Sequence, residues 1–198
     1  MSTTFHLVRH GETDAVDHTL CGRMPGVGLN STGREQARAA GRRLAGLRPL
    51  RIFTSPLERA RETAGIIAGD TGCPVQQAEE LQEIDCGEWT GKAFAELHAD
   101  PRWKDWNEVR SVARPPGGEM MIEVQARVAG FLELLRRMYD NARLVIVSHS
   151  DVIKAAVLFH VGISLDLFSR IEVAPGSIST LIVGNWGARL VSLNETCA

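Results

Sequence analysis

The stretch that decides the fold is Thr4-Phe5-His6-Leu7-Val8-Arg9-His10-Gly11-Glu12-Thr13. Its apolar first part predicts a strand over about residues 4–9, which stops at an arginine, a histidine and a glycine turn. A neutral imidazole at such a strand end can attack phosphorus, while the neighbouring guanidinium neutralises phosphoryl oxygens. The tripeptide alone is a weak hint, so its meaning depends on the rest of the chain.

Strand-like and helix-like segments alternate after this first strand. A Thr32-x-x-Glu35 capping box predicts the start of a helix, and residues 51–54 predict a short strand. Ser55 is then expected to cap a second helix, with Pro56 at its first position, Glu58 completing a capping box, and an end near residue 70.

The second half of the chain continues this alternation. An apolar stripe from Met121 to Met138, at steps of three and four, predicts a long helix with one face in the core. Residues 144–147 predict a central parallel strand, a helix pattern follows over 151–161, and residues 179–183 and 189–193 predict closing strands. The pattern favours an α/β fold, a three-layer sandwich with a mostly parallel central sheet and helices on both faces.

Residues 91–118 differ from the alternating segments because they are rich in Trp, Arg and Pro. We interpret them as a helical excursion within a single domain that spans residues 1–198. The excursion either covers a pocket, with Trp103 and Trp106 near the substrate, or packs at the periphery without touching it.

The composition narrows the possible partners. The chain has 198 residues and a net charge of −2, so any affinity for phosphate must come from a local cluster of cations. We therefore expect no nucleic-acid partner. No apolar run reaches membrane-spanning length and no basic, apolar leader opens the chain, so we expect no membrane association. The four scattered cysteines predict free thiols and a cytoplasmic location.

Three predicted strands end in polar residues that suit an anion: Arg9-His10, Ser55 and Ser148-His149. Ligands of parallel α/β sheets lie outside the carboxyl ends of the strands. Helix N-termini at that edge offer free backbone N–H groups and a favourable dipole to a phosphate. Residues far apart in sequence are therefore expected to meet around one phosphate.

Five motifs in this order resemble the histidine phosphatase superfamily, on the branch of phosphoglycerate mutases and small phosphatases such as α-ribazole phosphatase. The motifs are Leu7-Val8-Arg9-His10-Gly11-Glu12-Thr13, Ser55-Pro56-Leu57-Glu58-Arg59-Ala60-Arg61-Glu62-Thr63-Ala64, Leu81-Gln82-Glu83-Ile84-Asp85-Cys86-Gly87-Glu88-Trp89, Pro116-Gly117-Gly118-Glu119 and Val147-Ser148-His149. Each motif is modest evidence, but all five in order are highly specific.

The resemblance implies a role for each site residue. His10 is the expected nucleophile, Arg9 and Arg59 clamp the phosphoryl oxygens, and His149 stabilises the transferring group. Glu83 is the expected acid for the leaving alcohol and then the base for water. A carboxyl beside a bound phosphate has a raised pKa, which keeps it protonated enough to donate.

The motif alignment, not spacing, selects Arg59 over Arg61, which we expect to be a surface charge. In the acid-phosphatase branch an Asp follows the second histidine directly, whereas Ser150 intervenes before Asp151 here. This spacing favours Glu83 as the acid. Ser150 stands where relatives often have Gly, and its backbone N–H is expected to face the phosphate.

Two further positions depart from the family pattern. Val16 replaces an Asn that often contacts phosphate in relatives. Arg23 lies in a Gly22-Arg23-Met24-Pro25-Gly26 segment that differs from the commoner Gly-Arg-x-Asp, so Arg23 is a weaker expectation for substrate binding.

We expect no metal and no cofactor. His6 and His10 lie roughly 13 Å apart along a strand, too far for two ligands of one ion. The resulting hypothesis is a metal-independent phosphomonoester hydrolase that acts on a small phosphorylated metabolite through a phosphohistidine. A mutase is the nearest alternative, although only residues 92–118 separate Gly91 from Glu119, where mutases of the branch are usually longer. A catalytically silent phospho-ligand-binding protein is a third, and no feature predicts an oligomeric state.

Overall fold

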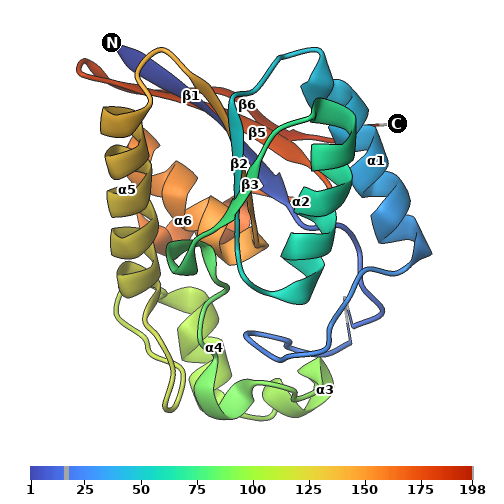
Figure 1. Ribbon diagram of the computed structural model, residues 1–198. Helices are drawn as coiled ribbons and strands as arrows, with labels where there is room; N and C mark the ends of the chain where they lie inside the picture. Colours follow the sequence, from blue (N-terminus) through green and yellow to red (C-terminus); the bar gives the residue numbers. More distant parts are fainter. Residues whose placement is uncertain (16–17, 198) are drawn as a thin grey trace.

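The computed structural model describes residues 1–15 and 18–197 (Figure 1). Six strands form one sheet in the order β3-β2-β4-β1-β5-β6. Their bounds are β1 Ser2–Arg9, β2 Arg51–Thr54, β3 Val75–Gln77, β4 Arg143–Ser148, β5 Ile178–Gly184 and β6 Gly187–Glu195. Strands β3, β2, β4 and β1 are parallel, whereas β5 and β6 are antiparallel to their neighbours. The prediction of a mostly parallel sheet is confirmed.

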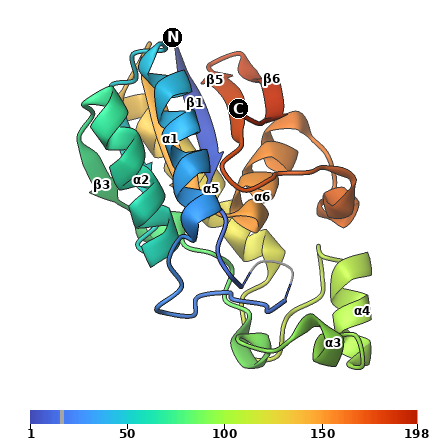
Figure 2. The ribbon, with the colours of Figure 1, turned by 90° about the vertical axis from the view of Figure 1, so that its right-hand side faces the viewer.

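Four helices cover the two faces of this sheet, which confirms the three-layer sandwich. Helices α1 (Ser31–Ala45) and α2 (Glu58–Thr71) lie on one face, and α5 (Met121–Met138) and α6 (Ser150–Val161) lie on the other (Figures 1 and 2). Alternation along β1 explains the two cores. Val8 packs in the α1–α2 core, whereas Phe5 and Leu7 pack in the α5–α6 core.

The predicted helix starts are wrong in both cases where a capping box was invoked. Helix α1 is capped by Asn30, whose side-chain oxygen accepts a hydrogen bond from the Gly33 N–H at 2.8 Å, not by Thr32. Helix α2 begins at Glu58, with Leu57 at the N-cap position in place of Ser55. The Ser55 hydroxyl accepts from the Leu57 N–H at 3.3 Å and lies 2.8 Å from His149 Nε2, so it bonds no N–H group within helix α2.

The long helix α5 buries the predicted stripe as far as Leu135. The expected last member of that stripe is wrong, since Met138 is 61% exposed. Helix α5 ends at Met138, whose side chain points away from the core, while Tyr139 directly after it packs against Phe53 of β2.

The excursion over residues 91–118 contains α3 (Phe94–Leu97) and α4 (Pro101–Glu108). Figures 1 and 2 show both helices beyond the carboxyl ends of the parallel strands. The Trp103 ring packs edge-on against Trp89 at 5.4 Å, and Trp106 packs against the same ring at 6.4 Å. Three short 3₁₀ segments complete the fold, at Glu79–Leu81, Gly87–Trp89 and Leu165–Arg170.

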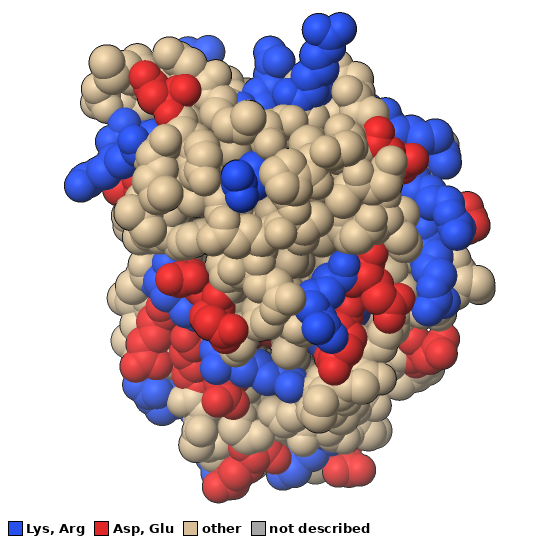
Figure 3. All heavy atoms as spheres, in the orientation of Figure 1, with Lys and Arg blue, Asp and Glu red and all other residues tan. Residues whose placement is uncertain are grey.

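On the face in Figure 3, basic and acidic side chains are interspersed, and neither kind forms one extended charged patch. Within residues 1–15 and 18–197, no helix combines the length and apolarity needed to cross a membrane. Cys21, Cys73, Cys86 and Cys197 are free thiols, as the sequence predicts. Cys86 is buried, and burial raises the pKa of its thiol, which fits an inert core residue.

Candidate active site

The strand register brings the predicted strand ends together. Arg9 of β1 pairs with Ser148 of β4, and Thr54 of β2 pairs with Val147. The next residues remain in register, because the His10 N–H donates to the Ser148 carbonyl at 2.9 Å. The His10 and His149 rings consequently lie 5.1 Å apart, centroid to centroid.

Two contacts set the tautomer of His10. Its Nδ1 lies 2.7 Å from the carbonyl oxygen of Gly11, which can only accept, so Nδ1 carries the proton. Its Nε2 accepts from the Arg59 Nε–H at 3.2 Å, so Nε2 has the lone pair. Burial, aided by Arg59 and Arg9, holds the pKa of His10 well below 6.5. His10 is therefore a neutral imidazole whose lone pair is on Nε2.

A close backbone approach fixes the turn that carries His10. A Cβ on Gly11 would meet the carbonyl oxygen of Gly33 at 2.3 Å, so only glycine fits there. The Gly11 N–H donates to the Thr63 hydroxyl at 3.1 Å, and that hydroxyl donates to the Arg59 carbonyl at 2.7 Å. The nucleophile and Arg59 thus share one support on α2.

Arg59 lies in the first turn of α2 and is 3% exposed. Its Nη2 donates to the Gly22 carbonyl at 2.8 Å. Its Nη1 is buried and has no hydrogen-bond partner among the described residues. Burial lowers the pKa of its guanidinium. Arg61, two residues further on, is exposed, as expected. Arg59 therefore offers a phosphoryl oxygen a donor that the described part of the protein does not use.

His149 occupies the N-cap position of α6 and is fully buried. Its Nε2 lies 2.8 Å from the Ser55 hydroxyl. Its Nδ1 has no hydrogen-bond partner among the described residues and lies 3.9 Å from Glu83 Oε2. Burial, with Arg59 and His10 nearby, holds the pKa of His149 well below 6.5. Both residues that contact His10, His149 and Arg59, therefore have a buried nitrogen without a hydrogen-bond partner among the described residues.

The carboxyl of Glu83 is suited to hold a proton near neutral pH. Burial and the nearby Asp151 raise its pKa to about 7, although Arg59 and the Ile84 N–H oppose the shift. The Ile84 N–H donates to Glu83 Oε1 at 2.9 Å, which leaves Oε2 on the side of His149.

An ion network supports the backbone of Glu83 from behind. Arg23 donates to the Glu83 carbonyl at 2.8 Å and to Glu119 at 3.0 Å. Arg127 binds both oxygens of Glu119, at 2.8 and 3.1 Å, and reaches the Glu83 carbonyl at 3.4 Å. Arg23 thus lies behind the acid and is not among the residues that line the cavity.

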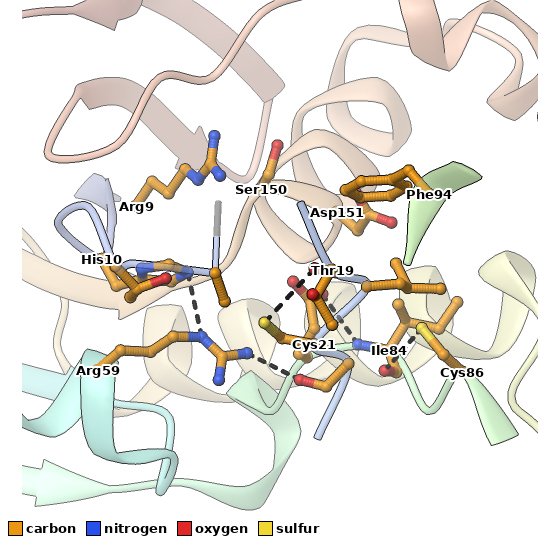
Figure 4. Close-up of a pocket in the computed structure, with 15 residues that line it drawn as sticks. Arg9, His10, Thr19, Cys21, Arg59, Ile84, Cys86, Phe94, Ser150 and Asp151 are labelled. Atoms are coloured by element: carbon orange, nitrogen blue, oxygen red, sulfur yellow. Dashed lines mark hydrogen bonds between the residues drawn. The ribbon is translucent and has the colours of Figure 1, made fainter. Parts of the chain in front are cut away.

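The site residues open onto a cavity of about 250 Å³ (Figure 4). Arg9, His10 and Arg59 form its inner end, and Arg9 also donates to the Val173 carbonyl at 2.7 Å. Ser150 lines the cavity from the first turn of α6. The structure therefore brings His10, Arg9, Arg59, Glu83 and Ser150 to one cavity, with His149 directly behind.

The excursion reaches this cavity through a residue that the sequence did not single out. Phe94 of α3 lines the cavity, whereas Trp103 and Trp106 do not. Trp103 packs against Trp89 and Phe94, and Trp106 packs against Trp89. The sequence left two interpretations of the excursion open. The excursion covers the pocket through Phe94, whereas Trp103 and Trp106 pack at the periphery.

The sequence did not predict several residues that support the site. Ser55 was placed in a helix cap, and its bond to His149 depends on a contact between two strands. Thr63 and Arg127 lie within helices that the sequence predicts, but nothing in their spacing shows where they point. Val16 lies outside the described residues. Among the described residues, no group of three or more His, Cys, Asp or Glu side chains is arranged to bind a metal ion.

Comparison with known proteins agrees with this geometry. The model of the histidine phosphatase superfamily (branch 1) matches residues 5–196. The chain belongs to this superfamily, and the prediction of a phosphatase-type enzyme is confirmed at that level.

Individual relatives include both phosphatases and a mutase. The chain is 29% identical to adenosylcobalamin/alpha-ribazole phosphatase of Escherichia coli (strain K12) over 96% of its length and 94% of the relative. It is 32% identical to a 2,3-bisphosphoglycerate-dependent phosphoglycerate mutase of Chelativorans sp. (strain BNC1), covering 89% and 90%. The solved structure of a mycobacterial glucosyl-3-phosphoglycerate phosphatase superposes with a TM-score of 0.89 at 27% identity, covering 99% and 100%.

Proposed function

We propose that this protein hydrolyses small phosphomonoesters through a phosphohistidine on His10 and needs no metal ion. The observation that carries the proposal is the state of His10, a buried neutral ring whose Nε2 lone pair lies against Arg59 in a cavity that Arg9 also lines. A nucleophile in this state attacks without a separate base. The cations supply the charge neutralisation that phosphoryl transfer mainly requires.

In the first step, His10 Nε2 forms a bond to phosphorus while the bond from phosphorus to the alcohol oxygen breaks. Glu83 donates its proton to the departing oxygen. The phosphoryl oxygens take the Arg59 Nε–H away from His10 and also accept from Arg59 Nη1 and His149 Nδ1. The phosphorylated ring becomes positive, and its Nδ1–H bond to the Gly11 carbonyl stabilises that charge.

In the second step, Glu83, now ionised, takes a proton from a water molecule that attacks phosphorus. The N–P bond breaks and its electron pair returns to His10 Nε2, so inorganic phosphate leaves and both residues regain their starting states. One residue serves as acid and then as base, for which a pKa near neutrality is suitable.

A mutase is the second candidate, because a relative of this length and 32% identity is named as one. A mutase returns the phosphoryl group to a second hydroxyl where a hydrolase passes it to water. Interconversion of 2- and 3-phosphoglycerate without release of phosphate would establish the mutase. Release of inorganic phosphate at the rate of substrate loss is the expected result.

The central experiment compares wild type with His10→Ala on phenyl phosphate, followed by rapid alkaline quenching to trap phosphohistidine. We expect a trapped phosphoenzyme in wild type, and no phosphoenzyme and no turnover in the variant. His98→Ala, at an exposed position, is the matched control and should retain full activity. Substantial turnover by His10→Ala would contradict the assignment, and binding without turnover by wild type would indicate a silent ligand-binding protein.

Metal dependence is tested separately. Wild type should keep its full rate in excess chelator, because cationic side chains occupy the positions where a metal would balance phosphoryl charge. A rate that collapses in chelator and returns with a divalent cation would exclude the metal-independent mechanism.

A further inference from the structure

The outer part of the cavity differs in chemistry from the end that holds His10. Ile84 and Phe94 line it, and Ala15 and Leu20 are further apolar residues of the same cavity. In Figure 4, Ile84 and Phe94 lie on the side of the cavity opposite His10 and Arg59. The alcohol portion of a substrate whose phosphoryl group meets His10 would lie against this apolar surface.

Backbone hydrogen bonds hold the apolar surface in place. The loop that carries Leu20 pairs with the excursion, since the Leu20 N–H donates to the Lys92 carbonyl at 3.0 Å. The Gly91 N–H donates back to Leu20 at 2.8 Å, and Thr19 and Ala93 form an antiparallel bridge. Leu20 and Phe94 therefore belong to two segments that are hydrogen-bonded to each other. The apolar surface that they form is preorganised for binding a substrate.

The outer part also lacks a positive charge for a ligand. Among the described residues that line the cavity, the only cations are Arg9 and Arg59, and both lie at the His10 end. The charged side chain on the outer side is Asp151, a carboxylate that binds Arg110 and offers an anion no donor.

The cation bound to Asp151, Arg110, is already occupied. Arg110 of the excursion binds Asp151 at 3.0 Å, and its side chain is only 10% exposed. Its guanidinium carbon lies 4.6 Å from the centre of the Trp106 ring and 4.3 Å from that of Phe168. Because the two rings and the carboxylate enclose Arg110, it cannot turn toward a substrate carboxylate without leaving Asp151 unpaired.

We propose that the site selects phosphomonoesters whose alcohol portion is compact and uncharged, and that it discriminates against esters with a carboxylate or a second phosphate. An apolar group gains by leaving water for the surface of Leu20, Ile84 and Phe94. An anionic group in the same place loses its hydration and finds Asp151 in place of a partner. This specificity rests on the proposed phosphatase function.

The experiment compares two esters of equal length, propyl phosphate and 3-phosphooxypropanoate, which differ by a terminal methyl against a carboxylate. The value of kcat/KM is measured for each by release of inorganic phosphate. We expect the neutral ester to be preferred by about tenfold or more, the size of effect that one mismatched group produces in a binding pocket.

Two variants assign the preference to particular side chains. Asp151→Asn should raise kcat/KM for the carboxylate ester and so shrink the ratio of the two kcat/KM values. Effects on the chemical step that both esters share cancel in this ratio. Phe94→Ala should also shrink the ratio, by lowering kcat/KM for the neutral ester. Phe159→Ala is the matched control, because that ring is 55% exposed and does not line the cavity.

The outcomes separate the two proposals. If the carboxylate ester is hydrolysed as well as or better than propyl phosphate, the inferred specificity is wrong and the phosphatase function stands. If wild type hydrolyses neither ester nor phenyl phosphate, the proposed function fails and the specificity fails with it. The wild-type ratio decides the specificity even if a variant does not fold.

Discussion

The inner and outer ends of the cavity are built by different means. At the inner end, His10 and His149 follow paired parallel strands, and the first turn of a helix supplies Arg59. At the outer end, Leu20 and Phe94 belong to a loop and to the excursion, which a few backbone hydrogen bonds join. The inner end is fixed by the sheet, whereas the outer end can change without disturbing the sheet.

This difference separates the chemistry from the choice of substrate. The parallel register holds the proposed catalytic groups in one fixed arrangement, which phosphoryl transfer requires. The excursion contributes the Phe94 ring, and its Arg110 is bound to Asp151. Variants at the inner end should therefore change the rate for every ester, and variants at the outer end should change the ranking of esters.

The largest effect is expected for Glu83→Gln, which keeps the shape of the side chain but removes the proton. The rate on phenyl phosphate should fall by about 10²–10⁴-fold. The loss should be smaller on 4-nitrophenyl phosphate, whose leaving group departs without a proton. Glu80→Gln, at an exposed position three residues earlier, is the control. Equal losses on both esters would contradict the role of Glu83 as acid.

Wild type and Glu83→Gln should differ in the pH dependence of kcat/KM. Because Glu83 must be protonated and its pKa is raised to about 7, wild-type kcat/KM should fall as the pH rises through about 7. Glu83→Gln should lose this alkaline limb. An unchanged alkaline limb in the variant would mean that another group titrates there.

A smaller loss, about 10²–10³-fold, is expected for Arg59→Lys on all esters alike. Lysine keeps the charge but cannot present several donors in one plane to His10, Gly22 and a phosphoryl oxygen. Arg61→Lys makes the same change at an exposed position and should have no effect. A loss confined to some esters would indicate that Arg59 selects among substrates and does not act in the chemical step.

The smallest effect is a shift of the pH profile in Asp151→Asn. The negative charge of Asp151 helps raise the pKa of Glu83, so its removal should lower that pKa. The alkaline limb of kcat/KM should therefore move to lower pH, while the maximal rate on phenyl phosphate changes little. A limb that stays in place or moves to higher pH would contradict this influence of Asp151 on Glu83.

Much of the inner end was predictable because it follows strands whose apolar runs are plain in the sequence. The runs before Arg9-His10 and Ser148-His149 indicated parallel strands, and parallel strands end at one edge. The helix starts were less predictable. The Thr32 and Ser55 capping patterns were present, but Asn30 and a hydrogen bond to His149 prevailed.

The outer end was not predictable, because its parts meet only through the folded backbone. The tryptophans of the excursion were the conspicuous candidates, yet they pack on Trp89, and Phe94 lines the cavity. The support of Glu83 by Arg23, Glu119 and Arg127 joins three distant segments in the same manner.

The sequence by itself determined the layered α/β fold, the superfamily and the residues proposed for the site, because periodicity and short motifs are local. Only the tertiary structure decided which His10 nitrogen has the lone pair, why the pKa of Glu83 is raised, and which side chains line the cavity. Each of these depends on burial and on partners from distant segments. Burial and distant contacts exist only once the chain has folded.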